Sequence, residues 1–256
     1  KLTHKEAWYA APAFTWQQVT ELNFADVERR LGEATLIACD IETIGDSDRS
    51  IECVGYSARF SDGTQQAFVV LFDSAWAYNF VRRVNANPVR KIFQHGQYDN
   101  AYFLRWNCPV NNWLFDTMNL IHSWYSELPK RLDFIATFAL RKVRYWKDDG
   151  KTGSIEDKMR YNGLDCWATL NGAISLIKEM PEWAMQNYLQ EFPMNFPALH
   201  CGMEGLAVDW NAFHAAKTRA TEESEKSLAR IRNLLSSPTF NPRSPPQMKE
   251  LFKLLG

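Results

Sequence analysis

The chain has 256 residues, of which 46% are hydrophobic, and its formal net charge at pH 7 is −1. This composition predicts a globular protein with a substantial core, and no apolar run has the length that a membrane span requires. The near-neutral charge argues against a surface coated in positive charge, although a local basic stripe can still follow phosphates.

Five cysteines are scattered along the chain without Cys-x-x-Cys spacing. An odd, scattered set predicts neither a disulfide framework nor a zinc site. We therefore expect a reducing location, the cytoplasm, or the host cytoplasm for a phage protein. The chain begins at Lys1 without an initiator methionine or a signal-peptide pattern, so we expect an excised fragment or a processed chain.

The central feature is an apolar strand, residues 36–43, that ends in two acids. Asp40 and Glu42 are spaced i, i+2, and alternate side chains of a strand share one face, so both carboxylates point the same way. A strand ending in a solvated acidic loop is the alternative reading. Acids that recur downstream, at Asp99 and Asp165, favour a shared site instead.

The segments around this strand predict a mixed sheet. Residues 51–57 and 66–72 alternate like strands, and Asp62-Gly63 between them is a hairpin signal, so the first three strands form an antiparallel meander. Helix and strand patterns then alternate, which predicts parallel strands with helical crossovers. Helices are expected at 24–31, 74–84 and 98–106, and strands at 89–93 and 113–115. The expected fold is α/β, with five strands flanked by helices.

Residues 94–100 lie where the fourth strand gives way to a helix. Asp99 falls in the first turn of that helix, where the dipole favours an acid with or without chemistry, so capping is an alternative role. His95 reads equally as a loop histidine, because no second histidine has metal-ligand spacing. Asp116 is expected to cap the next helix.

Residues 130–147 interleave basic and aromatic side chains. Such a segment can hold a single strand through phosphate contacts and base stacking, with Lys142 and Arg144 as the candidate contacts. A solvated amphipathic helix with an ordinary charged face is the alternative.

A long helix is expected from about Ser154, where a capping-box pattern begins, to Met180, before Pro181. Tyr161 and Asp165 within it are four residues apart and share one face. Gly163 between them leaves room for a ligand or a strand.

Brought together, the four acids form a cage for two divalent cations, Mg²⁺ or Mn²⁺. Two such ions about 3.5 to 4 Å apart stabilise the attacking and leaving oxygens of a phosphoryl displacement, which is nuclease chemistry. Tyr161 is placed to orient the attacking water.

Three short motifs carry a family resemblance: Asp40-Ile41-Glu42, Tyr98-Asp99 in a Gln-x-Gly-Gln-Tyr-Asp context, and Tyr161-x-x-x-Asp165. They resemble the motifs of the proofreading 3′→5′ exonuclease domain of family-A DNA polymerases, in the tyrosine branch of the DEDD superfamily, over roughly residues 30–180. The resemblance implies a ribonuclease H-like fold. It also implies that Asp40, Glu42 and Asp165 hold the catalytic metal and that Asp40 reaches a second ion. Asp99 then contributes through water, and Tyr161 positions the nucleophile.

One departure from the family is His95, which stands where the family usually has asparagine. With Gln97, it is a candidate contact to the terminal nucleotide.

The resemblance also shapes the expected domains and partners. Residues 1–185 are expected to be the exonuclease domain, and 186–256 a helical segment resembling the truncated start of the polymerase thumb. No palm acids follow, so no primer extension is expected. The expected partners are a single-stranded or frayed DNA 3′ end and the remainder of a polymerase, with no membrane. The alternatives are an exoribonuclease of the same superfamily and a non-catalytic module that holds a single strand.

Overall fold

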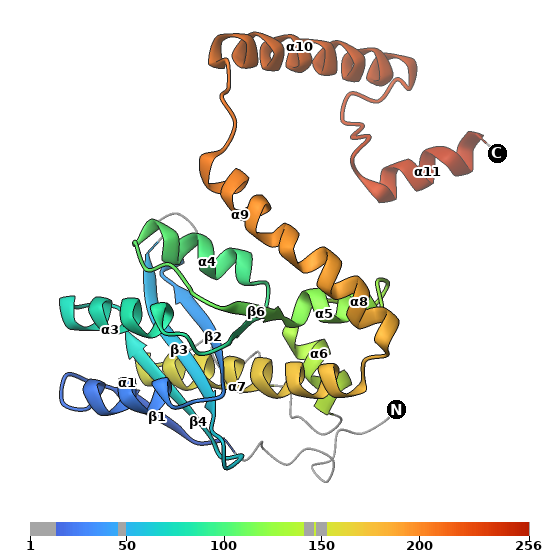
Figure 1. Ribbon diagram of the computed structural model, residues 1–256. Coiled ribbons are helices and arrows are strands. Elements are labelled where there is room, and N and C mark those ends of the chain that lie inside the picture. Colours follow the sequence, from blue (N-terminus) through green and yellow to red (C-terminus); the bar gives the residue numbers. More distant parts are fainter. Residues whose placement is uncertain (1–13, 46–49, 141–145, 147–152, 256) are drawn as a thin grey trace. The chain divides into compact units, whose positions relative to one another are not determined.

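A mixed sheet of six strands, in the order β1-β4-β3-β2-β5-β6, organises the protein (Figure 1). The computed structural model describes residues 14–45, 50–140, 146 and 153–255. The strands are β1 Trp16–Val19, β2 Leu36–Thr43, β3 Ile51–Arg59, β4 Gln65–Leu71, β5 Lys91–Phe93 and β6 Trp113–Asp116. β2, β3 and β4 are antiparallel neighbours, whereas β1 pairs with β4, β5 with β2, and β6 with β5 in parallel. The predicted meander and the parallel strands after it are confirmed.

The sheet has six strands, so the expected number of five was wrong. The additional strand is β1, which pairs in parallel with the edge of β4 from Trp16 opposite Ala67 to Val19 opposite Val70. Its four residues include two glutamines and show no apolar alternation. The segment is a strand because it pairs with β4, which is distant in the sequence. Such pairing leaves no pattern in the local sequence from which the strand could be predicted.

The helices of the first part of the chain are α1 Phe24–Gly32, α3 Ala75–Ala86, α4 Gly96–Arg105, α5 Thr117–Trp124, α6 Leu132–Leu140, α7 Ile155–Glu179 and α8 Glu182–Glu191. Helix α7 begins at a capping box, in which Ser154 and Asp157 bond each other's backbone N–H groups. Asp116 caps α5 by accepting from the N–H groups of Met118 and Asn119. Both expected caps are confirmed.

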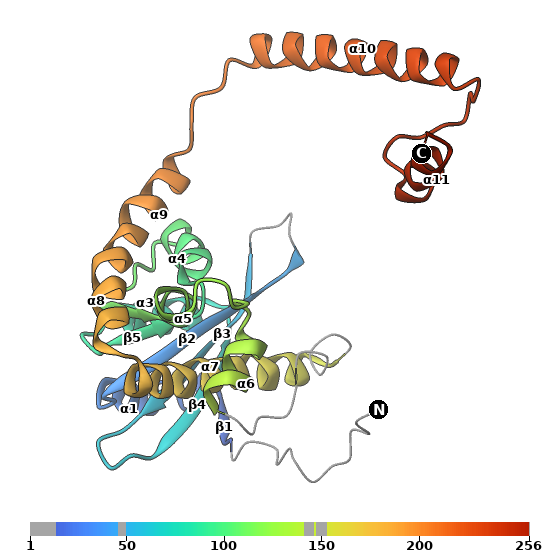
Figure 2. The same ribbon diagram turned by 90° about the vertical axis from the view of Figure 1, so that its right-hand side faces the viewer.

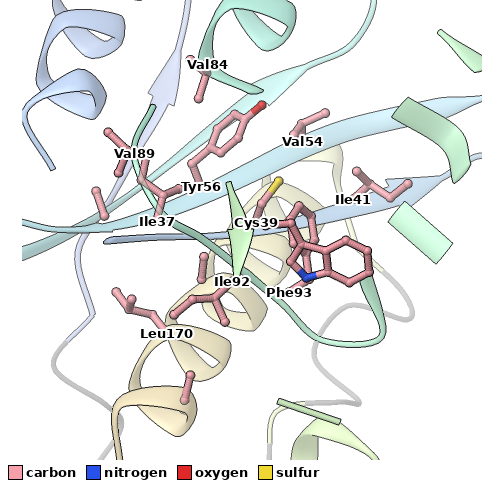
Figure 3. Close-up of a cluster of buried hydrophobic side chains, with 14 of the residues drawn as sticks. Ile37, Cys39, Ile41, Val54, Tyr56, Val84, Val89, Ile92, Phe93 and Leu170 are labelled. Atoms are coloured by element: carbon pink, nitrogen blue, oxygen red, sulfur yellow. The ribbon is translucent and has the colours of Figure 1, made fainter. Parts of the chain in front are cut away.

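Helices cover both faces of the sheet (Figure 1). Successive side chains of each strand point alternately toward the helices on one face and those on the other. Figure 3 shows Ile37 and Cys39 of β2 lying with Tyr56 of β3 and Val84 of α3 in the buried core. Tyr56 also contacts Phe80 of α3, with ring centroids 6.2 Å apart. Since successive side chains alternate, the even-numbered residues of β2 face the opposite side, which α7 covers.

Two glycines let α7 lie close to the sheet. Gly55 of β3 lies under α7, and a Cβ there would fall 2.2 Å from Asn162 Oδ1. On α7 itself, a Cβ at Gly163 would fall 3.2 Å from Val69 of β4. The room that the sequence analysis expected at Gly163 is therefore occupied by a strand. Helix α6 lies beside α7 and contacts it (Figure 2).

The chain divides into two compact units, Lys1–Met203 and Glu204–Gly256. The division falls later than the boundary proposed near residue 185, because the helix after α7 packs into the first unit. Tyr188 of α8 donates to the carbonyl of Leu114 at 2.9 Å, and Phe192 packs on Trp113 with centroids 5.4 Å apart.

The remaining helices follow in the order η1 Phe192–Met194, α9 Asn195–Glu204, α10 Trp210–Leu234 and α11 Pro245–Leu255. The helices α10 and α11 of the second unit contain no buried residue. No helix in the described ranges combines the length and the apolar character needed to cross a membrane.

Candidate metal centre

Three of the four predicted acids converge at one place. Asp40 and Glu42 project from β2 and Asp165 from α7, and one carboxylate oxygen of each lies within 4.8 Å of the others. Asp165 is only 4% exposed. Asp40 and Glu42 are partly buried. Like charges held so close repel one another, and a divalent cation relieves that repulsion. Carboxylate oxygens are the ligands that Mg²⁺ and Mn²⁺ prefer, so these residues fit such an ion.

The fourth acid, Asp99, supports β2 and is not a member of this three-acid cluster. Strand β5 pairs with β2 only at Ile37 and Ala38, so the last part of β2 extends beyond its neighbour. Asp99 Oδ1 accepts the Ile41 N–H there at 3.0 Å, in place of a strand partner. Asp99 therefore lies directly beside the two acids of β2, but its bond is to the backbone.

Burial raises the pKa of Asp99 to about 8, and the nearby charges of Asp116 and Glu42 add to the effect. An unfolded aspartate titrates near pH ~3.9. The folded protein therefore binds this proton more tightly than the unfolded chain, and its stability falls as pH rises between these two values.

We expect Asp99→Asn to gain stability relative to the wild type as pH rises from about 5 to about 8, because asparagine cannot ionise. The measurement is thermal unfolding in chelator at several pH values. A stability difference that stays constant across this range would show that Asp99 ionises in the fold as it does in the unfolded chain.

Two neutral donors that the sequence analysis missed bond the clustered acids. Asn162 Nδ2 donates to Asp40 Oδ2 at 2.8 Å, and Trp146 Nε1 donates to Asp165 Oδ1 at 2.5 Å. Asn162 is next to Tyr161 in the sequence of α7, and this adjacency to a predicted site residue could have indicated it. Trp146 lies in the basic and aromatic segment, and nothing in its spacing connects it with Asp165.

Tyr161 is half-buried and packs against the small hydrophobic cluster that contains Leu132, Trp146 and Leu164. Trp146 of the same cluster also donates to Asp165. Tyr161 and Asp165 both lie on α7, and a common face for the phenol and the carboxylate stays a prediction.

His95 and Gln97 lie at the start of α4, in different surroundings. His95 adopts a left-handed backbone conformation with φ of 59°, and its N–H donates to Asp116 Oδ1 at 3.1 Å. Its side chain is exposed. Gln97 instead donates from Nε2 to Asn195 Oδ1 at 3.0 Å, which directs its amide toward α9.

Lys142 and Arg144, the proposed contacts to a nucleic-acid strand, lie outside the described residues. Two described basic side chains earlier in the same segment, Lys130 and Arg131, have protein partners. Lys130 donates to carbonyls of the preceding loop, including that of Tyr125 at 2.9 Å, and Arg131 pairs with Asp133 at 2.7 Å.

No family model and no curated protein matches the chain. Solved structures do match. The polymerase domain of Pol1 from M. smegmatis, in complex with DNA primer-template and dNTP, has a TM-score of 0.67 at 12% identity. The match covers 92% of this chain and 40% of that chain, so the chain spans well under half of that structure.

Two further matches are ribonucleases. Trypanosoma brucei RNase D in complex with RNA U12 has a TM-score of 0.58 at 14% identity, covering 77% of this chain and 73% of that chain. Escherichia coli RNase D, an exoribonuclease involved in structured RNA processing, has a TM-score of 0.52 at 15% identity, covering 71% and 51%. At these identities the likeness shows the fold alone, which is a ribonuclease H-like α/β fold.

Proposed function

We propose that the protein is a metal-dependent 3′→5′ exonuclease that releases nucleoside monophosphates from DNA 3′ ends. The observation that carries this proposal is the three-acid cluster, in which two acids of β2 meet Asp165 of α7 within 4.8 Å. Asp40, Glu42 and Asp165 would hold the cation, and Asp99 supports the backbone between the first two. Bound divalent ions supply charge stabilisation for the attacking and leaving oxygens of a phosphodiester.

The chain's own groups have separate tasks in this proposal. The carboxylates bind the cations and bring them to one point. Tyr161 orients the attacking water from the same helix as Asp165. The exposed imidazole of His95, at the start of α4, contacts the terminal nucleotide. None of these roles involves reading a base, so cleavage is expected to be independent of sequence. Because the proposed contact is to the terminal nucleotide, cleavage is also expected to require a free end.

The polymerase-linked form of this activity is supported by how far the similarity extends. The match to the polymerase domain covers 92% of the chain, whereas the first unit, Lys1–Met203, makes up a smaller share of it. The similarity therefore reaches into the second, helical unit. We propose that this chain is the proofreading part of a family-A polymerase and that residues 186–256 include the start of the thumb.

An exoribonuclease is the second candidate, and the matches to two RNase D structures favour it. The acids required for RNA and DNA hydrolysis are the same. The difference between the candidates lies in recognition of the 2′-hydroxyl rather than in the metal centre.

One experiment separates these possibilities. The full chain is incubated with end-labelled single-stranded DNA or RNA, with Mg²⁺ or with chelator, and the products are resolved as a ladder. Stepwise shortening of DNA from the 3′ end, with no cutting of circular strands, supports the proposal, and preferential shortening of RNA supports the alternative. Binding without Mg²⁺-dependent cleavage of either would leave a strand-holding module.

Tyr161→Phe is expected to slow cleavage by about 5-fold, much less than loss of a clustered acid. The substitution removes one hydroxyl that orients water, and a hydrogen bond contributes roughly 1 kcal/mol. Single-turnover cleavage rates at saturating Mg²⁺ provide the measurement. A loss as large as that caused by removing Asp40 would give Tyr161 a larger role than orienting water.

Binding of single-stranded DNA is expected to be independent of sequence and to weaken steeply with salt, because phosphate contacts and stacking contain no base code. Lys142→Gln and Arg144→Gln should each weaken binding and reduce the salt slope by about 1. Fluorescence anisotropy in chelator at several salt concentrations measures both effects. Unchanged affinity in both variants would mean that the strand follows another path.

A further inference from the structure

The three-acid cluster is held in place by two neutral N–H donors. Asn162 reaches Asp40 from α7, and Trp146 reaches Asp165 from the stretch between α6 and α7. We propose that Trp146 and Asn162 are positioning residues that set the affinity of the three-acid cluster for a divalent cation. The inference rests on the proposed function, since it takes the cluster to be a cation site.

Both donors are themselves fixed before any cation binds. Trp146 is 2% exposed and packs with Leu132, Ala136 and Leu164. Asn162 is fully buried above Gly55, where there is no space for even one further carbon atom. A donor whose rotamer is locked by packing fixes the carboxylate that it bonds, so less conformational freedom is lost when the ion binds.

The chemistry of the two donors suits a cation site. An indole N–H and an amide N–H orient a carboxylate without a formal opposite charge, so neither donor cancels the negative charge that attracts the ion. The indole has no acceptor atom and cannot compete as a ligand. Asn162 Oδ1 has no hydrogen-bond partner among the described residues. The hydrogen bond from Nδ2 to Asp40 is therefore the polar contact that sets the orientation of the amide.

The test compares Mn²⁺ binding by isothermal titration calorimetry in the full-length wild-type chain and in three variants. Trp146→Phe and Asn162→Leu each replace one N–H donor with an apolar side chain. Trp113→Phe is the matched control, because Trp113 is 3% exposed and donates to the carbonyl of Phe115, away from the acids. Affinity should fall 10- to 100-fold in the first two variants, as for other groups that orient metal ligands, and stay within about 2-fold in the control.

The outcomes are distinguishable. If the wild type binds no Mn²⁺, the proposed cation site fails and this inference fails with it. If the wild type binds and Trp146→Phe and Asn162→Leu match the Trp113→Phe control, the proposed function stands and the positioning role is overturned.

A second variant guards against misfolding of Trp146→Phe. The benzothienyl analogue of tryptophan, incorporated at position 146 alone, keeps the ring shape and replaces N–H with sulfur. Its fold is checked by circular dichroism. A folded analogue that binds Mn²⁺ as tightly as the wild type would also overturn the proposal, whereas a 10- to 100-fold loss supports it.

Discussion

Asp40→Ala is expected to abolish Mg²⁺-dependent cleavage, with a rate at least ~1,000-fold below that of the wild type. Asp40 supplies one of the three clustered oxygens, and its loss removes several kcal/mol of charge stabilisation from the transition state. Asp165→Ala should be similarly severe, because the same cluster loses its only oxygen from α7. The measurement is the single-turnover cleavage rate of single-stranded DNA at saturating Mg²⁺.

Both variants should fold. In chelator they should melt at or above the wild-type temperature, because removing one carboxylate relieves repulsion among the others. Asp26→Ala is the matched control, since Asp26 is an exposed acid on α1 that pairs with Arg29. Near-normal cleavage by both site variants would show that the cluster is not the catalytic centre.

Gly55→Ala is expected to combine a loss of stability with a loss of activity. The added Cβ would lie 2.2 Å from Asn162 Oδ1 and 2.7 Å from Cys166 Sγ, and all three residues are buried between β3 and α7. Relief of this overlap moves Asn162 or lifts α7 from the sheet. Overpacking of this kind costs about 1 to 3 kcal/mol. A displacement of about 1 Å at a reacting centre costs roughly 100-fold in rate.

Gly32→Ala provides the matched control. A Cβ at Gly32, the last residue of α1, would have no neighbour within 4 Å, so this variant should be as stable as the wild type or slightly more stable. Unfolding in urea and cleavage rates measure the two effects together. If Gly55→Ala keeps wild-type stability and rate, close approach of α7 to β3 is not what places Asp165.

Local patterns in the sequence were sufficient for most of the fold. The apolar run at 36–43 is β2, and the capping box at Ser154 begins α7. Both signals are strong because the residues that produce them lie within one strand or one helical turn. Strand β1 escaped detection because its structure comes from pairing with β4, a contact between segments far apart in the chain.

The acids of the candidate site were identifiable for the same local reason. The i, i+2 spacing of Asp40 and Glu42 predicts a common face on a strand, and this holds whatever the rest of the fold does. The sequence alone therefore determined an α/β protein, a pair of acids at the end of a buried strand and a Tyr161–Asp165 pair on one helix.

Only the tertiary structure decided how these parts meet. Contacts across the chain place Asp165 with the acids of β2, direct Asp99 to the Ile41 N–H, and turn Gln97 toward Asn195. They also bring in Trp146, whose bond to Asp165 follows no sequence spacing. Hydrogen bonds between distant segments depend on the packing of the whole unit, and the absence of a Cβ at Gly55 allows α7 to approach β3.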